Sequence, residues 1–132
     1  MRWQAVVFLL SAAGAADGGL RPNYRKEKNT MIHVIAVITA KPGQRETVLA
    51  AFRANVPAVL AEQGCIEYGA AVDLPEGPAF QAPYGPDSLV VIEKWDSLDA
   101  LKAHGASPHM VAYGARTKEL VASRSIHILS PV

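Results

Sequence analysis

The sequence predicts an α+β domain of the ferredoxin-like type, with the element order βαββαβ and a second helix that is split in two. Three observations lead to this prediction. Four short runs are typical of strands, the first of them almost unbroken in β-branched residues, and the segments after the first and third runs carry apolar residues at helical spacing. Glycine and proline mark the breaks between these segments. The 132 residues have room for one such domain, which we place at residues 31–132.

The first strand is predicted at residues 32–39 (IHVIAVIT), an almost unbroken β-branched run of the kind that is buried on both faces. Residues 41–43 (KPG) end this strand, and the helix that follows is closed by Gln63 and Gly64. Pro57 falls inside this helix and should kink it. The apolar positions recur at spacings of three and four and give the helix one apolar face: Val48, Leu49, Phe52, Val56, Val59 and Leu60.

The second and third strands are predicted at residues 65–73 (CIEYGAAVD) and 88–95 (SLVVIEKW). Residues 74–87, between them, hold four of the nine prolines, a composition typical of a loop. A loop of this length could cover a pocket or reach across a dimer, and the sequence leaves both alternatives open.

The second helical region is predicted as two pieces. Asp96 and Ser97 cap the first piece, which ends at Gly105. Ser107-Pro108 begins the second piece, because proline is well tolerated in a first helical turn. We expect the second piece to carry Met110, Val111, Leu120 and Val121. The last strand is predicted at residues 123–129 (SRSIHIL).

The composition limits the possible partners. Residues 1–30 carry five basic and two acidic residues, a charge of +3, whereas residues 31–132 carry eight basic and ten acidic residues, a charge of −2. We therefore expect no nucleic-acid partner for the mildly acidic domain. The single cysteine, Cys65, excludes an intrachain disulfide, and no apolar run approaches the length of a membrane span, so no membrane partner is expected.

Residues 1–30 differ from the rest and allow two interpretations. Arg2, an apolar stretch over residues 5–13 and the small residues Ala13-Gly14-Ala15 are the parts of a secretory signal, which implies a periplasmic or secreted protein. Alternatively, the segment is translated leader from a misassigned start, since Lys26-Glu27 can be encoded as a ribosome-binding sequence upstream of Met31. The protein would then be cytoplasmic. In both cases we expect the segment to lie outside the domain and to be mobile.

Both faces of the predicted sheet are apolar. Val34 and Ala36 lie on one side of the first strand, whereas Ile35 and Val37 lie on the other. Two helices cover only one face of a four-stranded sheet, so the other face would be a large exposed apolar patch. We therefore expect a homodimer that packs sheet on sheet through this open face.

No single motif decides the chemistry, but a few polar residues stand among apolar ones. Glu93 lies late in a buried strand, so its carboxyl group must be hydrogen-bonded or protonated. It could act as a general base or as the partner of a histidine. Alternatively, it is a structural carboxylate that the backbone or a neighbouring basic group satisfies. His104 and His109 flank the helix break and could line a pocket, or could serve only in capping and packing. We expect no metal site, because no third ligand is near them in sequence.

Three further residues are weaker candidates. Tyr68 could direct its hydroxyl into a pocket, and Trp95 could form a pocket wall, although both are also common core residues. His33 lies at the start of the first strand, just after Met31 and Ile32, where exposure at an edge is the simpler explanation.

The sequence resembles the antibiotic biosynthesis monooxygenase family, and most of all its quinol monooxygenase-like branch. The resemblance covers residues 31–132 and lies in the segments 31–36 (MIHVIA), 64–68 (GCIEY), 93–95 (EKW) with His104, and 107–109 (SPH). It implies a dimeric α+β barrel with a pocket between each sheet and its helices. It also implies oxidation of a quinol or polycyclic phenol by O₂, without flavin, haem or metal. Some members of the family degrade haem with the help of a tryptophan and a haem-ligating histidine. In this sequence His104 stands in place of that tryptophan and Gly114 in place of that histidine, so we do not expect haem degradation.

The resemblance and the chemistry together suggest roles for the candidates. An ionised phenol can pass an electron to O₂, so the site needs a base in a dry pocket. We expect His104 to be this base or a hydrogen-bonding partner, with Glu93 as its orienter. His109 and Tyr68 would bind the substrate, and Trp95 and His33 would line the site. The alternatives are an isomerase of a small hydroxy-carbonyl compound on the same scaffold and a non-catalytic dimer that binds a small molecule.

Overall fold

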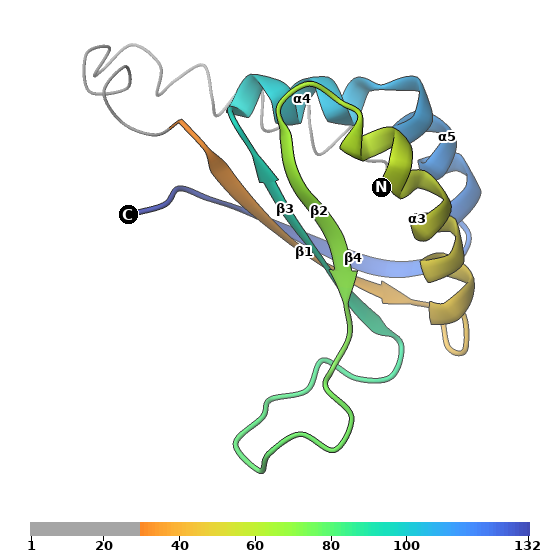
Figure 1. The fold of residues 1–132 in the computed structure, drawn as a ribbon. Helices are drawn as coiled ribbons and strands as arrows, with labels where there is room; N and C mark the ends of the chain where they lie inside the picture. The colour runs from red at the N-terminus through yellow and green to blue at the C-terminus, as the bar shows by residue number, and fades with distance from the viewer. Residues whose placement is uncertain (1–29) are drawn as a thin grey trace.

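The computed structural model describes residues 30–132 (Figure 1). In chain order the elements are β1 (Ile32–Ala40), α3 (Arg45–Leu60), β2 (Cys65–Ala71), β3 (Ser88–Trp95), α4 (Leu98–Ala106), α5 (Pro108–Thr117) and β4 (Val121–Leu129). Apart from Thr30, the segment for which a signal peptide or a misassigned start is predicted lies outside the described residues.

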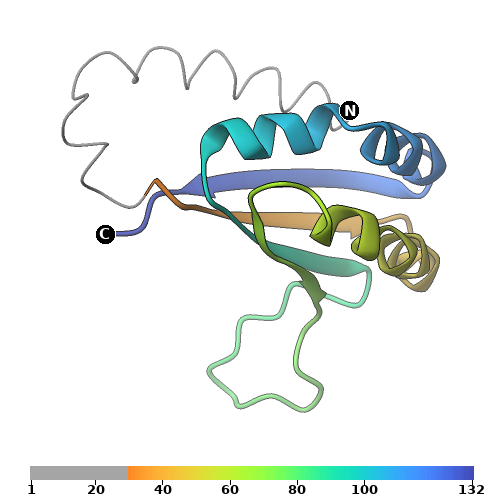
Figure 2. The same ribbon diagram turned by 45° about the horizontal axis from the view of Figure 1, so that its top comes forward.

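The four strands form one antiparallel sheet in the order β2-β3-β1-β4. The helices α3, α4 and α5 lie on the same side of this sheet, as Figure 2 shows. The order and the layers are those of a ferredoxin-like α+β fold, so the predicted fold class is confirmed. Glu93 in the centre of the sheet has Val34 of β1 on one side and Tyr68 of β2 on the other as its strand partners.

The core lies between the sheet and the helices. Alternate residues of β1 are buried, because successive side chains point to opposite faces of a strand. The helix α3 contributes Phe52, which stacks on Tyr68 with ring centroids 5.0 Å apart and meets the edge of the Tyr113 ring. Four residues of the apolar face predicted for this helix are buried (Val48, Leu49, Phe52 and Val59), whereas Val56 is partly buried and Leu60 is 51% exposed.

The end of α5 differs from the prediction. We expected a helix that carries Leu120 and Val121, but α5 ends at Thr117, and Val121 pairs with Ala40 in the sheet. The amide of Lys41 donates to the carbonyl of Leu120 at 2.8 Å. Pairing with β1 therefore begins the last strand two residues earlier than the predicted residue 123.

The long connection between β2 and β3 is held at its base. The Asp73 carboxylate accepts hydrogen bonds from the amides of Tyr84 (2.9 Å) and Gly85 (2.8 Å), which lowers the pKa of Asp73. From this base the loop extends beyond the end of the sheet that is distant from α4 (Figure 1). The second strand ends at Ala71, two residues earlier than predicted.

The turn between α3 and β2 packs closely against the start of α4. The Gly64 carbonyl accepts a hydrogen bond from the amide of Asp96 at 2.9 Å. Gly64 has φ +86°, and a Cβ atom there would lie 2.5 Å from Asp96 Oδ1 and 2.7 Å from Ala100 Cβ. Only glycine fits this position, so the turn is fixed relative to the helix that begins at Leu98.

The second face of the sheet carries no helix from the described residues. Its central residues are apolar: Val90 is half-buried and Ile92 is 37% exposed, and both pair with β1 residues of the same kind, Val37 and Ile35. This agrees with the apolar pattern read from both faces of these strands. Among residues 30–132, no helix has the length and hydrophobicity that a membrane crossing requires.

Candidate active site

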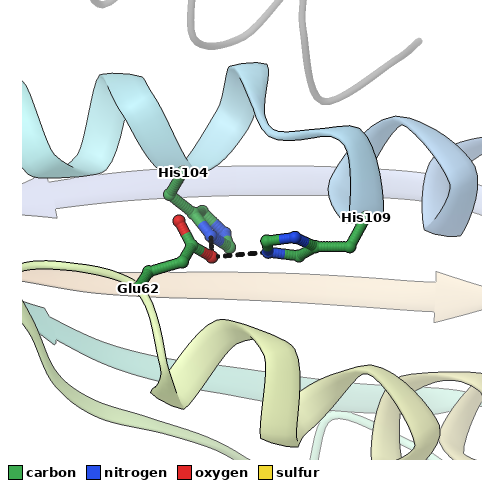
Figure 3. A group of neighbouring side chains, drawn as sticks. All are labelled: Glu62, His104 and His109. Carbon is green, nitrogen blue, oxygen red and sulfur yellow. Dashed lines mark hydrogen bonds and ion pairs between the residues drawn. The ribbon is translucent and has the colours of Figure 1, made fainter.

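Three polar side chains from separate parts of the chain converge beside α4 (Figure 3). One carboxylate oxygen of Glu62, Oε2, lies 2.7 Å from His104 Nδ1 and 2.8 Å from His109 Nε2. Glu62 comes from the turn after α3, whereas the histidines lie at the end of α4 and the start of α5. The side chains of Glu62 and His109 are 13% and 28% exposed, and that of His104 is fully buried.

The break between α4 and α5 places the two histidines. Ser107 stands between the helices in an extended conformation and caps both of them. Its hydroxyl donates to the His104 carbonyl at 2.7 Å and accepts from the Met110 amide at 3.4 Å. Pro108 occupies the first position of α5, where its missing N–H costs no hydrogen bond. The predicted break at this point is confirmed.

The His104 ring is enclosed by aromatic side chains. The Trp95 ring lies 4.7 Å away between centroids in a tilted arrangement, and the Tyr68 ring meets it edge-on at 5.5 Å. Burial lowers the pKa of His104, and the hydrogen bond with Glu62 only partly opposes this effect. The ring is therefore held neutral near pH 7. With Nδ1–H donating to the Glu62 carboxylate, Nε2 is the basic nitrogen.

Glu93 is fully buried on the same face of the sheet. Its Oε1 accepts a hydrogen bond from the Trp95 indole N–H at 2.9 Å. Burial raises its pKa to about 7, although the bond from Trp95 acts in the opposite direction. Glu93 Oε2 and the hydroxyl of its strand partner Tyr68 are buried without a hydrogen-bond partner among the described residues. Each such atom costs stability unless a ligand or water pairs with it.

The structure brings together five of the six residues that the sequence singled out: Tyr68, Glu93, Trp95, His104 and His109. His33 is not among them. It pairs with Lys94 and Leu129, on the opposite face of the sheet from Val34 and Glu93. Its place as a lining residue is therefore not supported by the fold.

The partner of His104 also differs from the expectation. We expected Glu93 to orient this histidine, but Glu62 makes the hydrogen bond at Nδ1, and Glu93 bonds to Trp95. Glu62 was missed in the sequence because it lies 42 residues before His104 and 47 before His109. One local signal was present: a carboxylate just after a helix C-terminus is disfavoured by the helix dipole and so calls for a compensating partner.

Known proteins resemble this chain in sequence and in fold. The profile of the family described as "Antibiotic biosynthesis monooxygenase" matches residues 31–116. A protein of Escherichia coli (strain K12) named "Probable quinol monooxygenase YgiN" is 46% identical over 103 residues, which are 76% of this chain and 98% of that protein.

Two solved structures resemble the fold. PA3566 from Pseudomonas aeruginosa superposes with a TM-score of 0.66 at 27% identity, over 78% of this chain and 95% of its own. Rv0793 from Mycobacterium tuberculosis has a TM-score of 0.64 at 28% identity, over 77% and 95%. The family profile spans most of the described residues and the E. coli relative is nearly half identical, so the chain belongs to the antibiotic biosynthesis monooxygenase family, in its quinol monooxygenase-like branch.

Proposed function

We propose that this protein is a cofactor-independent monooxygenase that oxidises a quinol or polycyclic phenol with O₂. The observation that carries the proposal is a pair of buried atoms, the Tyr68 hydroxyl and Glu93 Oε2, which lie beside the His104 ring and find no hydrogen-bond partner within residues 30–132. A phenolic hydroxyl and a carboxyl group beside a neutral imidazole suit the hydroxyl groups of a phenolic substrate. The name of the E. coli relative, "Probable quinol monooxygenase YgiN", supports the same substrate class.

The reaction needs no external reductant. A naphthoquinol plus O₂ gives a hydroxynaphthoquinone plus water, so the substrate supplies all four electrons. One oxygen atom forms a bond to carbon, and the other leaves as water. The protein must remove a phenolic proton, because the phenolate is the form that passes an electron to O₂.

The residues divide this work as follows. His104 Nε2 accepts the phenolic proton, and Glu62 fixes the tautomer and stabilises the imidazolium that forms. Tyr68 and Glu93 hydrogen-bond to the substrate oxygens, with Glu93 donating while it is protonated. Trp95 packs beside the His104 ring and excludes water from it. His109 holds Glu62 from the more exposed side.

We also propose that the protein is a homodimer in which a second copy covers the open face of the sheet. Ile35, Val37, Val90 and Ile92 form the apolar centre of that face. Apolar side chains at the centre of a sheet are more stable when a second surface removes them from water.

Oxygen uptake by the full chain tests the catalytic proposal. Naphthoquinols and anthrones are supplied in reduced form, and uptake is compared with the spontaneous rate. We expect one O₂ consumed per substrate, one ¹⁸O atom in the product and no accumulation of H₂O₂. In His104→Asn, whose amide can still bond to Glu62, uptake should fall to the spontaneous rate. Arg53→Gln, at an exposed site in α3, should retain the wild-type rate.

Three results would contradict the proposal. Stoichiometric H₂O₂ would identify a quinol oxidase instead of a monooxygenase. Wild-type rates in His104→Asn would remove the histidine from the chemistry. Saturable binding of the phenols with no uptake above the spontaneous rate would identify a binding protein.

A further inference from the structure

We propose that Glu62, His104 and His109 form a binding site for a divalent transition-metal ion. Two imidazoles and one carboxylate supply one ligand atom each, and these atoms lie within 4.8 Å of one another. The binding itself is independent of the proposed oxidation, and each can be tested without the other.

The distances are close to those that coordination requires. Zinc bonds of about 2.0–2.2 Å to nitrogen and oxygen place neighbouring ligand atoms roughly 2.9–3.4 Å apart, depending on geometry. Glu62 Oε2 now lies 2.7 and 2.8 Å from the two ring nitrogens. An ion therefore fits after Glu62 Oε2 moves away from each ring nitrogen by about half an ångström.

The ligand set selects the class of ion. Imidazole suits Zn²⁺, Co²⁺, Ni²⁺, Cu²⁺ and Fe²⁺, whereas Mg²⁺ and Ca²⁺ prefer oxygen ligands throughout. With one carboxylate and two neutral imidazoles, a divalent ion leaves a net charge of +1 on the occupied site. Water molecules can complete the coordination of the ion. Two histidines with one carboxylate is also the set that holds an ion while leaving coordination positions open.

The scaffold favours an ordered site that remains accessible. The buried His104 ring is fixed between Trp95 and Tyr68, and Ser107 holds both helix ends beside it. Ser107 Oγ also lies 3.2 Å from His109 Nε2. Glu62 and His109 are partly exposed, so an ion can approach from their side. Ligands that are already positioned lose little conformational entropy on binding.

The test uses the untagged full chain after chelator treatment. Co²⁺ is titrated and followed by its visible absorption, and Zn²⁺ binding is measured by calorimetry. We expect one ion per chain and a melting temperature that rises with Zn²⁺ concentration. Glu62→Gln and His109→Asn remove a ligand with little change in side-chain size, and each should weaken binding by more than about tenfold, the loss seen for even an outer-sphere partner.

Matched controls come from the remaining histidines. His33→Asn and His127→Asn lie on the other face of the sheet and should bind as the wild type does. The proposal is overturned if binding is not saturable, if Glu62→Gln and His109→Asn bind with wild-type affinity, or if a control variant abolishes binding. A strong thiolate-to-cobalt absorption band would assign the ion to Cys65 instead and would also overturn it.

Circular dichroism distinguishes loss of ligand from loss of fold. Both variants should retain the wild-type spectrum, since neither residue belongs to the apolar core. If either Glu62→Gln or His109→Asn unfolds, His109→Gln is measured instead. Its side chain keeps a polar amide group at position 109. Unchanged affinity in that variant would equally contradict the site.

Discussion

Glu62 Oε2 lies 2.7 Å from Nδ1 of His104, across 42 residues of sequence. This contact predicts the effect of Glu62→Gln. The neutral amide cannot stabilise an imidazolium, so kcat/KM for quinol oxidation should fall by about 10²-fold, the low end of what a general base contributes. The acid limb of the pH profile should shift, while KM changes little. Glu46→Gln, at an exposed site in α3, is the control, and equal losses in both variants would contradict a role for Glu62.

Tyr68→Phe should separate binding from stability. The hydroxyl is buried without a partner among the described residues, so its removal should leave the melting temperature unchanged or raise it. KM should rise by about tenfold, the loss of one hydrogen bond to substrate. Thermal melts and steady-state kinetics measure the two effects, with the exposed Tyr84→Phe as control. A clear loss of stability would mean that the hydroxyl is already satisfied.

Glu93 predicts a pH-dependent stability. Its pKa is about 7 in the folded chain, against 4.5 for a glutamate in water, so the folded chain retains a proton that the unfolded chain releases between these values. The stability gained below pH 4.5 is therefore lost as the pH rises to 7, by an amount on the order of 3 kcal/mol. Denaturant unfolding from about pH 4 to 8 should show this decrease in the wild type.

Glu93→Gln should remove that decrease, because the amide does not titrate. Glu67→Gln, on the exposed part of β2 beside Lys94, should retain it. If the wild type and Glu93→Gln show the same pH dependence, the carboxyl group is not protonated in the folded state.

The open face predicts the effect of a charge at its centre. Ile92→Glu should convert the proposed dimer to a monomer, because a carboxylate there would be buried against a second apolar sheet. Light scattering coupled to size exclusion measures the mass. Val111→Glu places the same charge on an exposed part of α5 and should leave the dimer intact. A monomeric wild-type protein would contradict the packing of sheet on sheet.

Zinc should inhibit the oxidation. An ion held by His104 takes the ring that the proposed base uses, so the rate should decrease as the site fills and recover after addition of EDTA. The concentration for half inhibition should equal the Kd from calorimetry. Inhibition that persists in His109→Asn, in which binding is weakened, would show that zinc acts elsewhere.

The strand boundaries were predicted correctly where the local residue pattern alone distinguishes a strand from a helix. The third strand begins and ends where the sequence places it, at Ser88 and Trp95, because both of its faces are apolar and a proline-rich loop precedes it. The predicted end of α5 was wrong, because Leu120 and Val121 fit a helical spacing as well as they fit a strand. Their hydrogen bonding to β1 is a tertiary effect, and no local pattern contains it.

The candidate site also contains residues that a local pattern reveals and a residue that only tertiary packing brings to the site. His104 and His109 stand out because a helix break separates two titratable residues by only five positions. Glu62 follows a long amphipathic helix in a polar turn, and only the docking of that turn on α4 brings it to the histidines. Alternation along β1 places His33 on the same face as Ile35, but only the packing of the helices shows that this face is the open one.

Gly64 has a consequence for the mutational tolerance of the chain. Gly43 shares its left-handed conformation, with φ +78°, but a side chain there would meet no atom within 4 Å. A substitution at residue 43 thus brings only backbone strain, whereas one at residue 64 adds collisions with Asp96 and Ala100. In a saturation library scored for activity, residue 64 should accept almost no replacement and residue 43 should accept asparagine or aspartate. A position that bears no functional group is in this way as constrained as the histidine that its turn helps to place.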